Sequence, residues 1–187
     1  MLRVTSFPAG YAPGMTRTPL DDTLLGVYLN DHLAGATAGV ALARRLAGEN
    51  RDTIHGDALR RLAGEIAQDR TALLDTMATV DVPVRHYKTW LAWAAEKAGR
   101  LKPNGRLFIR SPLSRVIGLE LMTLGVEGKA AGWHTLRTRA VTDSRLDPTR
   151  FGELIERAQR QATELEGLRR WAVAETFGGE APDPTRG

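Results

Sequence analysis

Cysteine is absent from this chain of 187 residues, and lysine is scarce: only Lys88, Lys97, Lys102 and Lys129 accompany the arginines. The lack of cysteine excludes disulfide bonds, thiolate metal sites, iron–sulfur clusters and cysteine nucleophiles. Aromatic residues make up only 6% of the chain, so Leu, Ala and Val must fill most of the interior. A chain of this length and composition suits a single helical domain in a reducing compartment, and we expect the cytoplasm.

Long apolar runs are missing as well. A membrane-spanning helix needs about 20 consecutive apolar residues, and the richest stretch, from Val116 to Val126, is interrupted by Glu120. Residues 1–18 contain no signal-peptide core, so we expect a flexible arm there and a flexible polar tail at residues 179–187. The net charge of +4 is too modest to require a polyanion. The sequence therefore predicts a soluble protein with neither a membrane nor a specific nucleic-acid partner.

Start and stop signals divide residues 19–178 into four long helices. The first is expected from about Leu20 to Leu46, and the second from about Asp57 to Thr79. Ser111-Pro112 and Asp147-Pro148 each combine a capping side chain with a proline at the first helical position, which predicts helices from there to about Arg139 and Phe177. The apolar residues of the second and last helices recur at helical spacing. The predicted faces are Leu59, Leu62, Ile66, Leu73 and Met77 in the second helix, and Phe151, Leu154, Ile155, Ala158, Ala162, Leu165, Ala172 and Val173 in the last.

The links between these helices differ greatly in length. Short links join the first helix to the second and the third to the last, whereas the middle link is long. The middle link contains a short amphipathic helix, expected from Arg85 to about Ala98. In a bundle of four helices such a link must run the length of the bundle. The sequence therefore predicts an all-α four-helix bundle with a long central crossover.

Several acidic residues fall on the expected apolar faces. A rotation of about 100° per residue places Glu120 and Glu127 inside the apolar stripe of the third helix and Asp31 near the middle of the stripe of the first. Glu65 and Asp69 lie on the flank of the second helix's stripe, with Asp69 closer to its centre. Because a lone buried carboxylate is costly, these acids predict either a metal site or a buried ion-pair network. The expected face of the third helix consists of Leu113, Val116, Ile117, Leu124 and Ala131, and that of the first of Leu24, Val27, Tyr28, Ala34, Ala38 and Leu42.

The helix count, the long central link and the acids on each helix resemble the ferritin-like superfamily. The resemblance covers all four helices and implies a bundle that holds two iron or manganese ions. Its ligands are one Glu from each of two helices and a Glu-x-x-His pair from each of the other two. On that pattern Asp31 matches the acid of the first helix, and Glu65 opens the motif of the second. Glu127, or Glu120 one heptad earlier, matches the acid of the third helix, and Glu164 opens the last motif.

Two departures weaken the implied metal site. Both histidines of the family pattern are missing, since Gln68 and Gly167 stand in their places. In addition, Arg169 is expected at the centre of the last helix's apolar face. A guanidinium there would neutralise inward carboxylates through bidentate hydrogen bonds and make a metal unnecessary.

Three function classes remain, and we favour a non-catalytic binding or structural protein whose dimetal site has degenerated. In that case no cofactor is bound, and Arg169 is the ion-pair partner of the inward acids. The alternative is a dimetal protein of iron or oxygen chemistry. A third class, an anion binder, would use the basic link between residues 97 and 115, although no nucleic-acid motif surrounds it. The dimetal alternative takes Asp31, Glu65, Glu120 and Glu127 as ligands, with His134 and Asp69 as additional ones.

Small residues form a strip on two of the helices. The first helix contains Ala34-Gly35-Ala36-Thr37-Ala38-Gly39, and the third carries Gly118, Gly125 and Gly132 seven residues apart. Such strips allow a neighbouring backbone to approach closely. They predict tight packing of these helices within the bundle, or alternatively the seam of a homodimer through the glycine-rich faces.

Overall fold

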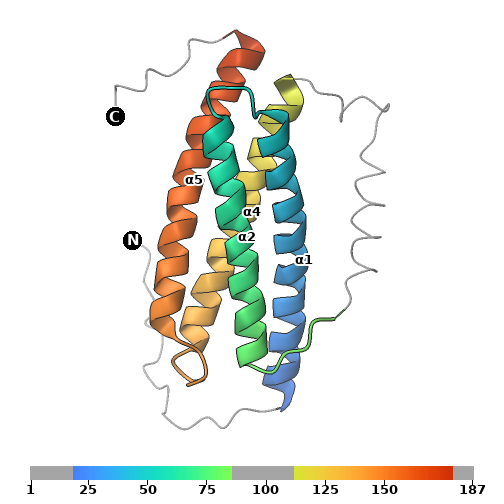
Figure 1. Cartoon of the computed structure of the whole chain (residues 1–187). Coiled ribbons are helices and arrows are strands. Elements are labelled where there is room, and N and C mark those ends of the chain that lie inside the picture. Colours follow the sequence, from blue (N-terminus) through green and yellow to red (C-terminus); the bar gives the residue numbers. More distant parts are fainter. Residues whose placement is uncertain (1–18, 86–111, 179–187) are drawn as a thin grey trace, which may run out of the picture.

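The computed structural model describes residues 19–85 and 112–178. They form four helices, α1 (Pro19–Glu49), α2 (Gly56–Thr79), α4 (Pro112–Arg139) and α5 (Pro148–Phe177), arranged side by side as a bundle (Figure 1). The predicted all-α four-helix architecture is confirmed, and the helix bounds lie close to those expected. The predicted N-terminal arm, short helix from Arg85 and C-terminal tail fall on or extend into residues outside the described ranges.

The ends of α5 show why the local signals were informative. The Asp147 side chain accepts a hydrogen bond from the backbone N–H of Thr149 at 2.8 Å, and Pro148 is the first helical residue. At the other end Gly178 adopts a left-handed conformation with φ of 71°, which glycine allows without strain. Between α1 and α2 the chain turns so tightly that a Cβ on Gly56 would lie 2.5 Å from the carbonyl oxygen of Arg51. Only glycine fits that position.

Helices α2 and α4 run in the same direction, so α2 ends and α4 begins at opposite ends of the bundle (Figure 1). Close backbone packing joins α4 to α5, α1 to α2 and α1 to α4. The small residues of α4 contribute to the last of these contacts, because a Cβ on Gly118 would lie 2.9 Å from Leu46 and one on Gly132 would lie 3.0 Å from His32. Packing within the bundle is thus confirmed for these two members of the glycine strip. None of the helices in the described residues is long and apolar enough to cross a membrane.

The apolar faces of α2 and α5 were predicted correctly. The whole predicted face of α2 is buried, and that of α5 is buried apart from Ala162 and Val173, which are partly covered. These residues contribute to two core clusters stacked along the bundle. Phe151 of α5 anchors one of them by stacking on Trp133 of α4, with ring centroids 6.1 Å apart.

The predicted face of α4 is correct at Val116, which is buried, and in part at Ile117, but wrong at its other positions. Leu124 is 69% exposed and Leu113 is 44% exposed, while Glu120 and Glu127 both lie on the solvent side. The error arose because α4 carries apolar residues on nearly every side, so the 3.6-residue period fits more than one face. The buried large residues of α4 are Val116, Leu119, Met122, Val126, Trp133 and Leu136.

The predicted face of α1 is correct only in part, since Ala34 is buried and Tyr28 and Leu42 are partly covered, but Ala38 is exposed. Leu24 and Val27 are exposed, whereas Leu29 and Leu33 are fully buried. Asp31 is exposed as a result. The cause is the same as in α4. Large apolar residues occur on opposite sides of α1, and the small residues between them do not indicate which side faces the core.

Candidate functional site

The predicted ligand residues do not gather at one place. Asp31, Glu120, Glu127 and His134 are exposed, and of the predicted ligands only Asp69 is buried, with Glu65 beside it half-buried. In residues 19–85 and 112–178, no group of three or more His, Cys, Asp or Glu side chains is placed to hold a metal ion. The inward position predicted for Asp31, Glu120 and Glu127 is therefore wrong. His134 is exposed too, so it does not join them as an additional ligand.

Arg169 does not neutralise inward acids either. Its side chain is 32% exposed and pairs with Glu166 on its own helix, with Nε and Nη2 donating at 2.7 and 2.9 Å. The hydrogen bonds from Arg169 and Arg170 lower the pKa of Glu166 to about 2. The predicted role of Arg169 as the inward ion-pair partner is wrong, because the residue sits at the edge of the bundle, where its own helix supplies a carboxylate.

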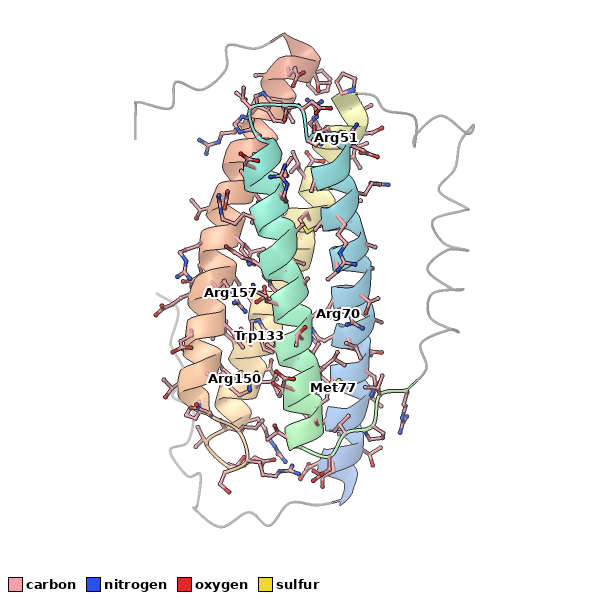
Figure 2. All side chains as sticks on the ribbon, in the orientation of Figure 1. Arg51, Arg70, Met77, Trp133, Arg150 and Arg157 are labelled. Carbon is pink, nitrogen blue, oxygen red and sulfur yellow. The ribbon has the colours of Figure 1, made fainter. Side chains whose placement is uncertain are left out.

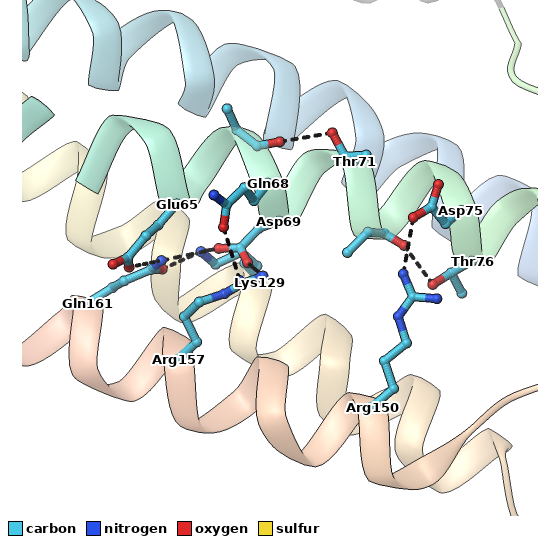
Figure 3. Close-up of polar contacts among 12 residues, drawn as sticks. Glu65, Gln68, Asp69, Thr71, Asp75, Thr76, Lys129, Arg150, Arg157 and Gln161 are labelled. Carbon is cyan, nitrogen blue, oxygen red and sulfur yellow. Dashed lines mark hydrogen bonds and ion pairs between the residues drawn. The ribbon is translucent and has the colours of Figure 1, made fainter. Parts of the chain in front are cut away.

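A buried charged centre does exist, and it is built on other residues. Asp69 of α2 is only 2% exposed. Nζ of Lys129, from α4, donates to Oδ2 of Asp69 and to Oε1 of Gln161, the latter at 2.6 Å. From α5, Nη2 of Arg157 pairs with Oδ1 of Asp69 (Figure 3). Three helices thus meet at one carboxylate.

Gln161 links this centre to a second carboxylate. Its Nε2 donates to Oε2 of Glu65 at 3.0 Å and to Oδ2 of Asp69 at 3.3 Å (Figure 3). We name these five residues, Glu65, Asp69, Lys129, Arg157 and Gln161, the Asp69 network. Its two cations balance its two carboxylates. Burial lowers the pKa of Lys129, and the neighbouring Asp69 carboxylate only partly opposes that change.

The Asp69 network is the middle of a series of polar contacts between α2 and α5. Near one end of the series Arg61 pairs with Glu164, the residue expected to open the last family motif. Toward the other end Nη2 of Arg150 lies 3.1 Å from Oδ2 of Asp75 (Figure 3). Long polar side chains reaching across from each backbone therefore join the two helices, in addition to the apolar residues that both contribute to the core.

A cavity of about 460 Å³ lies on the other side of the bundle, among α1, α2 and α4. Its wall is mostly apolar, and Asp69 and Lys129 belong to it. Four wall glycines would each place an added Cβ in open space, so nothing in the described residues occupies the volume beside them. These are Gly35 and Gly39 of α1 and Gly125 and Gly128 of α4.

Two ring systems also belong to the cavity wall. His32 lies against Tyr28, with ring centroids 4.4 Å apart, and burial lowers its pKa although Asp31 opposes the shift. The neutral imidazole is thus favoured near neutral pH. Trp133, labelled in Figure 2 among the interior side chains, is 3% exposed. Its indole Nε1 has no hydrogen-bond partner among the described residues.

Sequence reasoning identified Asp69 as an acid close to the α2 stripe but missed Lys129 and Arg157. Lys129 could have been noticed as a lysine four residues before Trp133 and three after Val126, spacings that place all of them on one helix face. Arg157 gave no such signal, because an arginine on a helix is ordinarily expected on the solvent side. Comparisons of the chain with protein-family models, curated proteins and solved structures gave no match.

Proposed function

We propose that this protein is a non-catalytic, ligand-binding four-helix bundle of ferritin-like descent, in which protein cations stand where ferritin-like proteins hold a metal pair. The observation that carries the proposal is the position of Lys129. Its ammonium group lies between the Asp69 carboxylate and the Gln161 amide oxygen, at the junction of three helices. Because the Lys129 ammonium group already neutralises the Asp69 carboxylate, no bound metal cation is needed to do so.

The chain topology supports the ferritin-like part of the proposal. Helices α2 and α4 are parallel, and α2 ends at the opposite end of the bundle from the start of α4 (Figure 1). Two short links and one long central link fit this arrangement, as in ferritin-like bundles. Glu65 and Asp69 also come from the helix that provides the first Glu-x-x-His position in the family pattern.

The donor set does not fit a pair of iron or manganese ions. Such sites use several carboxylates and imidazoles, whereas the Asp69 network contains two carboxylates and no histidine. Both carboxylates already accept hydrogen bonds from Lys129, Arg157 or Gln161. Two divalent ions would lie beside two fixed cations, and that repulsion is severe at low dielectric. No step of a reaction is therefore assigned to a metal.

Metal content and thermal stability test this proposal. Protein purified without a metal-affinity step, from medium supplemented with iron and manganese, should contain well under one atom of either metal per chain. A chelator should leave the melting temperature unchanged, because no metal stabilises the native state by mass action. Two atoms per chain, lost in Glu65→Ala but retained in the control Asp75→Ala, would contradict the proposal. Asp75 is a suitable control because it is an exposed acid of the same helix.

A further inference from the structure

We propose that residues 86–111, the link between α2 and α4, dock along a diagonal band of exposed apolar residues on the outer side of α1 and α4. The link lies outside the described ranges, whereas the band belongs to the described bundle. Leu24 and Leu124 are 59% and 69% exposed, and a row of such residues on a folded domain marks a surface that another segment covers. The diagonal band consists of Leu24 and Val27 of α1 and Leu113, Leu121 and Leu124 of α4.

The diagonal band runs from one end of the bundle to the other. Leu24 and Val27 lie in the first third of α1, whereas the three leucines of α4 lie in its first half. Because α1 and α4 run in opposite directions (Figure 1), the two groups are displaced toward opposite ends of the bundle. Asp31 of α1 and Leu121 of α4 line one cavity, so the outer sides of the two helices form a common face. The band therefore begins where α2 ends and finishes where α4 begins, which are the two points that the link joins.

The chain that leaves α2 already follows α1. Nδ2 of Asn30, on α1, donates to the carbonyl oxygen of Pro83 at 3.2 Å, and its Oδ1 accepts from the backbone N–H of Arg85 at 2.8 Å. Asn30 lies three positions after Val27 on the same helix, so the two side chains are neighbours on its surface. Residue 86 therefore starts beside the α1 end of the diagonal band. The contact with Asn30 directs the link toward α1 and away from α5.

The link is long enough to follow the diagonal band. An extended chain from residue 86 to residue 111 spans about 85 Å. The link must retrace α2, whose 24 residues make a helix about 36 Å long. The surplus length leaves room for the amphipathic helix expected from Arg85 to about Ala98. That stretch contains Trp90, Leu91 and Trp93, and burying such large apolar side chains against the band is favourable.

Charge complementarity indicates the same partner. Asp31, Glu120 and Glu127 lie in or beside the diagonal band, are exposed, and have no ion-pair partner among the described residues. The link is basic, with Glu96 as its one acid, so opposite charges favour its docking on this face. A second copy of the chain would instead bring the acids of both copies together, because a two-fold contact uses the same face twice. The basic residues of the link are Lys88, Lys97, Arg100, Lys102, Arg106 and Arg110.

Paramagnetic relaxation in the full chain tests this placement. The chain has no native cysteine, so Ala131→Cys of α4 can carry a single nitroxide at an exposed position beside the diagonal band. Thr71→Cys of α2 is the matched control, since Thr71 is also exposed and lies on the α2–α5 side. The label on residue 131 should attenuate the amide signals of Trp90 and Trp93 at least twofold more than the label on residue 71. Equal attenuation by the two labels would overturn the proposal.

A mixing experiment distinguishes the link of the same chain from that of a second copy. Protein that carries the nitroxide on residue 131 but no isotope label is mixed with isotope-labelled wild-type protein. The amide signals of Trp90 and Trp93 should keep their intensity in the mixture, because the contact is intramolecular. Attenuation in the mixture would show that the link docks on another copy and would overturn the proposal.

Substitutions in the diagonal band test whether its apolar residues hold the link. Val27→Gln and Leu124→Gln should each speed amide hydrogen exchange in residues 88–98 at least fivefold, because glutamine removes apolar contact area. Val141→Gln is the matched control and should leave this exchange unchanged, since Val141 is 84% exposed but lies between α4 and α5. Exchange of the core amides of α2 and α5 verifies that each variant folds. The same exchange rate in the wild type and all three variants would overturn the proposal.

Discussion

The space between neighbouring helices is filled differently on the α2–α5 side and on the α1–α4 side of the bundle. Between α2 and α5, long polar side chains such as Arg157 and Arg150 bridge the two backbones. Between α1 and α4, glycine and alanine predominate, and a cavity remains where their side chains stop short. The first side is closed by paired charges, and the second is left open.

The two sides differ in how firmly they hold the helices together and in how much space they leave between them. The Asp69 network ties α2, α4 and α5 together at one point and contributes stability only while all its charges are matched. The α1–α4 side packs closely at Gly118 and Gly132 and still leaves a cavity beside the two helices. Lys129 belongs to both regions, since it pairs with Asp69 and also forms part of the cavity wall.

The largest expected effect comes from removing the shared carboxylate. Asp69→Asn should lower the free energy of unfolding by about 3–5 kcal/mol, because Lys129 and Arg157 would remain buried without their main counter-charge. Urea denaturation measures the change. Asp75→Asn is the matched control, since its pair with Arg150 is half exposed and should be worth less than about 1 kcal/mol. Equal losses in the two variants would show that burial does not distinguish the contacts.

A smaller effect of the opposite sign is expected on the open side. Gly125→Ala should raise the free energy of unfolding by about 0.5–1 kcal/mol, because alanine favours the helix and its methyl group meets no neighbour. Gly132→Ala should gain less or lose stability, because its Cβ would lie 3.0 Å from the His32 ring. The same urea titrations compare the two. A larger gain at Gly132 than at Gly125 would contradict the assignment of the open side.

The smallest effect is expected at the bundle edge. Arg169→Met should cost no more than about 1 kcal/mol, because its pair with Glu166 is substantially exposed and Arg170 retains that carboxylate as a partner. The depressed pKa of Glu166, about 2, means that the pair contributes stability above pH 4.5 and loses it as the pH falls toward 2. The difference between Arg169→Met and the wild type should therefore shrink in acid. A loss as large as that of Asp69→Asn would instead place Arg169 in the interior.

The same contrast explains how much of the fold was predictable. In α2 and α5, charged residues surround one apolar stripe, so periodicity alone identified Leu62 and Leu165 as core. In α1 and α4, large apolar residues such as Leu24 and Leu124 lie on the solvent side, so the stripe was assigned to another face. The ends of α5 were predictable because they depend on local capping and glycine chemistry.

The candidate site was less predictable than the fold for a related reason. A buried charged centre was expected, but its members depended on the rotation of each helix about its own axis. Once the α4 face was misassigned, Glu120 replaced Lys129 in the predicted interior. The partnership of Lys129 with Asp69 joins residues 60 positions apart, and only the packed arrangement of three helices brings them together.

The charge balance of the Asp69 network also constrains how this chain can diverge over generations. Loss of Asp69 alone, or of both cations alone, leaves a buried charge unmatched, whereas replacement of a complete ion pair by apolar residues of similar volume is tolerated far better. Substitutions in this network should therefore be retained mainly when the acid and its cation are replaced together. Among sequences descended from a common ancestor, positions 69, 129 and 157 should covary, with the acid and its cations retained or lost together.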